Sequence, residues 1–142
     1  MVSHALEKEA ISQNLVRQSE MGPCVMTTLR TKQPRQHDDA HRKFIASLPC
    51  IICGDDTSTE AAHIRFADAT VDKRATGMGE KADDAFTLPL CGECHRNQHG
   101  MGERGFWALR VGDPIRIALA LYRVSGDHEA GMRIINAVRH PF

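Results

Sequence analysis

Residues 91–99, with the sequence CGECHRNQH, hold two kinds of potential metal ligand within nine positions. Cys91 and Cys94 have the C-x2-C spacing of a zinc knuckle, in which a tight turn aims two thiolates at one tetrahedral ion. His95 and His99 lie four residues apart, so on a helix both imidazoles leave the same face about one turn apart. The stretch therefore predicts a thiol site and a second, separate metal site on a histidine pair.

A matching thiol pair lies upstream in the sequence CIIC, at Cys50 and Cys53. Because 37 residues separate Cys53 from Cys91, an intervening hairpin or loop insertion must bring the two pairs together. Four thiolates close the coordination sphere of zinc, so this ion is expected to be structural. Cys24 is left over as the fifth cysteine.

Residues 1–20 lack the apolar run of a signal peptide, so we expect a cytoplasmic chain with reduced thiols. Reduced thiols favour zinc over disulfides. No run is long enough to span a bilayer, and no membrane partner is expected. The net charge of zero argues against a strongly basic nucleic-acid binder, although residues 30–43 are locally basic.

The 142 residues suffice for one domain, or a small domain with extensions. The pattern predicts an α+β fold in which two short strands are flanked by helices at both ends. The expected helices cover residues 3–20, 38–48, 94–99, 104–110, 113–124 and 127–138; the strands fall within 57–66 and 85–90, and a loop covers 67–83. Trp107 is expected as a core anchor, and Ile115, Leu119 and Tyr122 as the inward face of the helix over 113–124.

We divide the chain into an N-terminal helix and basic arm (1–36), a zinc-containing core (37–112) and a C-terminal helical hairpin packed on that core (113–142). The N-terminal helix could mediate a dimer, but the sequence leaves the oligomeric state open.

His63 lies on the first expected strand. The order strand, loop, strand, helix would place His63 around one cleft with His95 and His99. The competing interpretation is a buried core histidine between Ala62 and Ile64.

The pattern CIIC…AAHI…DDAFTLPLCGECHRNQH, within roughly residues 45–110, resembles the HNH nucleases. Their ββα-metal motif is often braced by a four-cysteine zinc. The resemblance is strongest to the phage and prophage group that includes recombination-associated nucleases, and the stretch GERGFWALRVGDP extends it. It implies a ββα-metal core, a hydrolase acting on DNA, and a catalytic Mg²⁺ or other divalent cation.

Residue by residue, the resemblance implies that His63 is the general base and that His95 and His99 are metal ligands. Asp84 stands at the family's middle position, usually Asn, which orients the base or braces the loop. The phosphate contacts implied by the resemblance are Arg65, Lys81 and Arg96.

One departure from the family lies before the base, where Asp or His usually helps to hold the metal and this chain has Ala62. Either the ligand is missing, or Asp68, Asp83 or Asp84 replaces it.

The sequence thus predicts a metal-dependent endonuclease that hydrolyses DNA, with branched and single-stranded DNA among the candidate substrates. It leaves open RNA as the substrate. The alternatives are a catalytically inactive, zinc-stabilised nucleic-acid-binding module and a protein-interaction zinc domain. A thiol oxidoreductase fits less well, because no thioredoxin-like βαβ pattern accompanies the cysteine pairs.

Overall fold

The computed structural model describes residues 34–141 of the chain, most of which belong to a compact unit that begins at Arg35. The expected helix over residues 3–20, most of the arm and Cys24 lie outside the described residues. Within the described part, no helix is long and apolar enough to cross a membrane.

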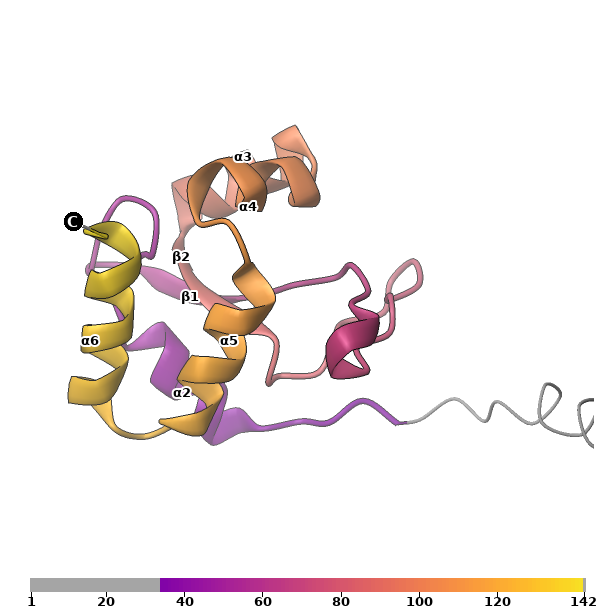
Figure 1. Cartoon of the computed structure of the whole chain (residues 1–142), viewed down its shortest axis with the longest axis horizontal. Coiled ribbons are helices and arrows are strands. Elements are labelled where there is room, and N and C mark those ends of the chain that lie inside the picture. Colours follow the sequence, from indigo (N-terminus) through magenta and orange to yellow (C-terminus); the bar gives the residue numbers. More distant parts are fainter. Residues whose placement is uncertain (1–33, 142) are drawn as a thin grey trace, which may run out of the picture. The chain divides into compact units, whose positions relative to one another are not determined.

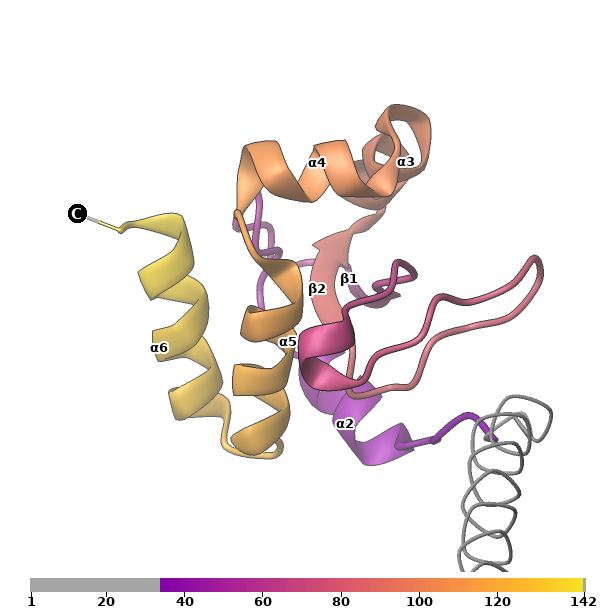
Figure 2. The same cartoon turned by 45° about the vertical axis from the view of Figure 1, so that its right-hand side comes forward.

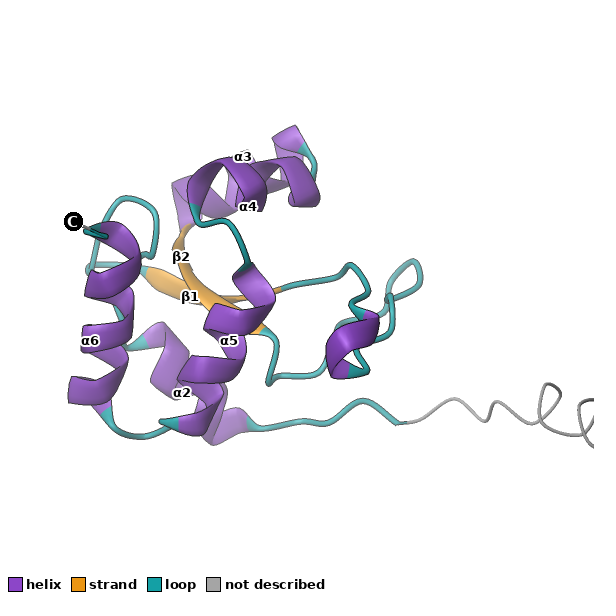
Figure 3. Ribbon diagram, in the orientation of Figure 1, coloured by secondary structure: helices purple, strands orange, loops and turns teal. Residues whose placement is uncertain are grey.

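The described elements are α2 (Asp39–Ala46), β1 (Thr59–His63), the 3₁₀ helix η1 (Ala69–Val71), β2 (Thr87–Cys91), α3 (Gly92–Met101), α4 (Glu103–Arg110), α5 (Pro114–Arg123) and α6 (His128–Arg139), shown in Figures 1 and 3. Helices thus combine with one small sheet, which confirms the α+β class.

The sheet is an antiparallel pair of strands in which Thr59 lies opposite Cys91 and His63 lies opposite Thr87. Helix α2 packs against both strands, α5 packs against β2, and α3 follows β2 directly. All five residues of β2 are buried, as expected for a short strand covered by helices. Figure 2 shows α5 and α6 side by side next to this sheet.

Aspartate caps explain where three helices begin. The side chains of Asp38, Asp113 and Asp127 each accept a hydrogen bond from the backbone N–H three residues later. These caps begin α2, α5 and α6 within a residue of the expected positions, so the three helix predictions are confirmed.

The prediction of a helix over residues 94–99 was wrong at both ends. α3 begins at Gly92 rather than at Cys94 or His95, because the Cys91 sulfur accepts the Cys94 N–H and caps the first turn. It also runs through Gly100, since a helix tolerates one glycine at a cost of about 1 kcal/mol. It ends at Gly102, whose φ of 82° suits glycine and separates α3 from α4.

Tyr122 was expected to face inward on α5, and this prediction was also wrong. Tyr122 is 38% exposed, whereas Leu121, one position earlier, is fully buried. The tyrosine ring instead lies edge-on against the ring of His41 in α2, with 4.8 Å between the centroids. The apolar stripe of α5 is therefore rotated by about one residue from the predicted stripe.

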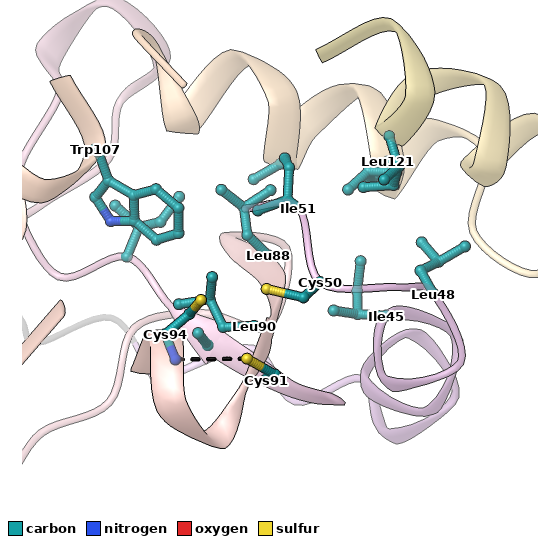
Figure 4. Packing of buried hydrophobic residues seen from close by; sticks show 14 of the residues in the cluster. Ile45, Leu48, Cys50, Ile51, Leu88, Leu90, Cys91, Cys94, Trp107 and Leu121 are labelled. Atoms are coloured by element: carbon teal, nitrogen blue, oxygen red, sulfur yellow. Dashed lines mark hydrogen bonds between the residues drawn. The ribbon is translucent and has the colours of Figure 1, made fainter. Parts of the chain in front are cut away.

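The hydrophobic core lies between the sheet and the helices that cover it (Figure 4). Trp107 is fully buried, which confirms its predicted place as a core anchor. Gly131 lets α6 approach α2 closely, because a Cβ there would lie 2.8 Å from the Phe44 ring. The sulfurs of Cys50, Cys91 and Cys94 point toward one another beside Leu90 in Figure 4.

We expect Leu88→Ala to lower the free energy of unfolding by about 2 to 5 kcal/mol, because Leu88 is fully buried in β2. Denaturant unfolding of zinc-loaded protein measures the change. Leu109→Ala is the matched control, since Leu109 is 76% exposed and its truncation should change stability by less than about 0.5 kcal/mol. Equal losses for the two variants would contradict the packing described here.

Candidate metal centres and pocket

Four cysteines converge on one point between the start of β1 and the end of β2. The sulfurs of Cys50, Cys53, Cys91 and Cys94 all lie within 4.8 Å of one another, and the Cys53 and Cys91 sulfurs are 3.6 Å apart. A tetrahedral zinc with Zn–S bonds of about 2.3 Å requires about 3.8 Å between sulfurs, whereas a disulfide requires about 2.05 Å. The spacing therefore fits a cluster that can hold a metal ion such as zinc.

Backbone hydrogen bonds build the first half of this cluster. The Cys50 N–H donates to the Asp55 carbonyl (2.8 Å), and the Ile51 N–H donates to the Pro89 carbonyl of β2 (3.0 Å). Gly54 closes the turn with a φ of 80°, and a Cβ there would lie 2.4 Å from the Arg139 guanidinium. The backbone conformation thus favours glycine here, while the Arg139 side chain could shift away from a Cβ.

The electrostatics of the cluster favour a bound cation. Burial raises the pKa of the Cys94 thiol, and the neighbouring Cys91 and Cys50 raise it further. Four adjacent thiolates would repel one another, and a bound cation offsets this repulsion. The four thiols therefore release their protons when the cation binds. Sulfur ligands in tetrahedral spacing favour zinc among common cations. Among the described residues, no other group of three or more metal-binding side chains meets the same 4.8 Å criterion.

A pocket of about 730 Å³ lies between α2, β1, α3 and the loop that precedes β2. Its lining includes His63 at the end of β1 and both His95 and His99 on α3. The tertiary structure therefore brings the three histidines into one pocket. The complete lining is Asp39, Arg42, Lys43, Ala46, Glu60, Ala61, His63, Arg65, Gly79, Glu80, Lys81, His95 and His99.

His63 forms a hydrogen bond with the buried carboxylate of Asp84. Its Nε2 lies 2.8 Å from Oδ1 of Asp84, which is fully buried and does not line the pocket. Arg35 donates to the same Oδ1 (2.5 Å), and the Asp38 backbone N–H donates to Oδ2 (2.8 Å). Asp84 thus fixes the orientation of the His63 ring.

The charges of this network set two pKa values. Burial by itself would raise the pKa of Asp84, but hydrogen bonds from the Asp38 backbone, His63 and Arg35 outweigh it and lower the pKa to about 2. Burial lowers the pKa of His63, and Asp84 offsets this only in part. Near neutral pH, Asp84 is therefore an anion and His63 a neutral imidazole.

These protonation states decide which nitrogen of His63 carries the proton. Arg35 also approaches Nε2 at 3.3 Å, but an ionised carboxylate at 2.8 Å is the stronger partner, and it can only accept. Nε2 therefore carries the proton and donates it to Asp84. Nδ1 of His63 keeps its lone pair, which is the requirement for a general base.

The chain segment before α2 holds the loop that carries Asp84. Arg35 Nε donates to the Ala82 carbonyl (2.9 Å), the Gln36 N–H donates to Asp83 (2.8 Å), and the Asp84 N–H donates to the Gln36 carbonyl (3.1 Å). Sequence reasoning missed this role for Arg35, because it treated residues 30–43 as a locally basic stretch. No local pattern pairs residues 35–36 with 82–84, so the sequence holds no clear signal for the contact.

The second histidine group involves an acid that sequence reasoning also missed. Nδ1 of His95 lies 2.9 Å from Oε2 of Glu60, which is on β1. The rings of His95 and His99 lie 4.9 Å apart between centroids and are tilted by 31°. Both histidines leave the same face of α3, as their spacing of four residues predicts.

The remaining sequence candidates divide into two groups. Lys81 and Arg65 line the pocket, and Arg65 also donates to the Gly77 carbonyl (3.2 Å). Arg96 is exposed on α3 and is not among the lining residues. Asp68 caps η1 by accepting from the Thr70 N–H, and Asp83 is bonded to the Gln36 N–H, so both are engaged outside the pocket.

Comparison with known proteins assigns the chain to a family. Residues 2–121 match a family described as a protein of unknown function, DUF968. The chain belongs to this family. The match includes both cysteine pairs, His63 and the helix histidines. No curated protein and no solved structure matches the chain.

We expect the purified protein to contain one zinc per chain, because the four-thiol cluster closes a tetrahedral site. Cys50→Ser should abolish this zinc and lower the melting temperature, since the cluster ties two distant segments together. Metal analysis and thermal unfolding measure the two effects. Cys24→Ser is the matched control and should retain the zinc. A Cys50→Ser protein that keeps full zinc and stability would contradict the assignment.

Proposed function

We propose that this protein is a metal-dependent endonuclease with the ββα-metal arrangement of the HNH nucleases. The observation that carries the proposal is the pocket that His63 on β1 shares with His95 and His99 on α3, the helix that directly follows β2. In this arrangement a base on a strand faces metal-binding histidines on a helix, which is what hydrolysis of a phosphodiester requires.

The chemistry of the base follows from its protonation. His63 takes a proton from water at Nδ1 while the water oxygen attacks phosphorus. The bond from phosphorus to the leaving oxygen of the DNA backbone breaks, and that oxygen takes a proton from solvent. The resulting imidazolium is stabilised by Asp84, which already accepts the Nε2 proton. Arg35 and the Asp38 N–H keep Asp84 ionised and fixed in place.

The metal ion would be held by His95 and His99. Two imidazoles one helical turn apart, with exposed or partly exposed rings, fit a divalent cation. When bound, such an ion supplies positive charge for the phosphate and the leaving oxygen. The four-thiol cluster would have a separate, structural role, because its coordination sphere is closed.

The cationic side chains of the pocket support a phosphate substrate. Four of them, Arg42, Lys43, Arg65 and Lys81, line it together with three carboxylates. Because phosphate contacts release counterions, we infer that binding of DNA weakens steeply as salt increases. The alternative, an inactive zinc-stabilised nucleic-acid-binding module, shares this salt dependence but predicts no cleavage.

With Mg²⁺ or Mn²⁺ present, we expect the protein to nick supercoiled plasmid, and His63→Ala to reduce the rate at least about 100-fold, because the base is lost. Gel quantification of nicked plasmid measures the rate. His37→Ala is the matched control, since His37 is exposed and does not line the pocket. Equal nicking by wild type and His63→Ala would sink the proposed mechanism, and binding with no nicking by wild type would favour the inactive module.

The pH dependence of nicking tests the protonation of His63. Because burial lowers the pKa of His63 below its ordinary 6.5, the base stays neutral at and above that pH. The rate should be independent of His63 ionisation above pH 6.5 and fall about tenfold per pH unit below its pKa. Single-turnover rates between pH 4.5 and about pH 8 measure the profile. A midpoint of the acid limb above pH 6.5 would contradict the assignment.

A further inference from the structure

One acid of the pocket, Glu60, has no role in the proposed mechanism. Three carboxylates line the pocket: Asp39, Glu60 and Glu80. Asp39 pairs with Arg42, and Glu80 pairs with Arg74 at 2.5 Å. Glu60 is the lining acid whose carboxylate touches a histidine, at 2.9 Å from Nδ1 of His95.

The position before the general base cannot supply a ligand in this fold. Ala62 is fully buried in the hydrophobic core, opposite Leu88 of β2. A carboxylate in its place would lose its hydration among apolar side chains. Either this ligand is missing from the chain, or another residue that lines the pocket provides it.

The three aspartates that the sequence offered as replacements are engaged in other contacts. Asp68 accepts from the backbone of η1, and Asp83 accepts from the Gln36 N–H. Asp84 is buried behind His63. None of the three lines the pocket.

We propose that Glu60 is the carboxylate ligand of the divalent cation held by His95 and His99; this inference rests on the proposed function. Neighbouring ligand atoms of an octahedral ion with bonds of about 2.1 Å lie about 3 Å apart. The 2.9 Å between Glu60 Oε2 and His95 Nδ1 matches that separation. The ligand atoms of Glu60, His95 and His99 do not all lie within 4.8 Å of one another in this structure, so the exposed His99 ring has to turn toward the other two to reach the same ion.

The proposed site has a defined cation chemistry. One carboxylate and two imidazoles form a mixed oxygen and nitrogen set, which suits Mn²⁺ and similar first-row divalent ions. The anionic ligand offsets part of the cation charge that two neutral imidazoles leave uncompensated. Glu60 also supplies, from two residues earlier on the same strand, the ligand that Ala62 cannot provide.

Mn²⁺ titration of the full-length, zinc-loaded protein tests this site, with free Mn²⁺ counted by electron paramagnetic resonance. We expect one Mn²⁺ per chain beyond the zinc, and loss of this ion in His95→Ala. Glu60→Gln should weaken Mn²⁺ binding by about tenfold or more, because a neutral amide replaces an anionic ligand. Zinc content and the melting temperature, measured on the same samples, show that each variant is folded.

Asp39→Asn is the matched control, because it removes one negative charge from the same pocket without touching His95. Its Mn²⁺ affinity should stay within about threefold of wild type, since only long-range charge is lost. Equal weakening in Asp39→Asn and Glu60→Gln would overturn the ligand assignment in favour of general electrostatics.

Two other outcomes separate this inference from the proposed function. If His95→Ala abolishes Mn²⁺ binding while Glu60→Gln binds like wild type, Glu60 is not a ligand, and the nuclease proposal stands. If the wild-type protein binds no Mn²⁺ beyond the zinc, the inference and the metal-dependent function both fail.

Discussion

The structure depends on the convergence of four thiols that lie on distant segments. Cys50 and Cys53 follow α2, whereas Cys91 ends β2 and Cys94 lies in the first turn of α3. A sheet of two short strands is marginal without further support. A metal ion bound by the cluster would fix the strand register and the direction of α3, and therefore the position of every side chain that α3 carries.

Helix α3 serves two sites through adjacent residues. Cys94 is buried and faces the thiol cluster, while His95 is partly exposed and faces the pocket. The tight turn that presents the thiols therefore also aims the imidazoles, because both belong to the same first turns of the helix. Under the proposed function, this coupling would let a structural ion in the thiol cluster position a catalytic ion without touching it.

The other side of the pocket depends on a buried charge. Asp84 has no exposed surface, yet it is ionised because Arg35, His63 and a backbone N–H surround it. A buried anion is stable only with such partners. The contact of residues 35–36 with residues 82–84 therefore holds the Asp84 carboxylate next to His63. This carboxylate keeps the proton of His63 on Nε2.

Local patterns were enough to predict the two cysteine pairs, the starts of α2, α5 and α6, the spacing of His95 and His99, and the burial of Trp107. Each follows from residues within a few positions, where helix geometry and turn chemistry act directly. Only the tertiary structure decided that Arg35 holds Asp84, that Glu60 touches His95, and that Leu121 rather than Tyr122 is buried. These depend on contacts between segments far apart in the chain, whose pairing is set by the sheet register and core packing rather than by any local pattern.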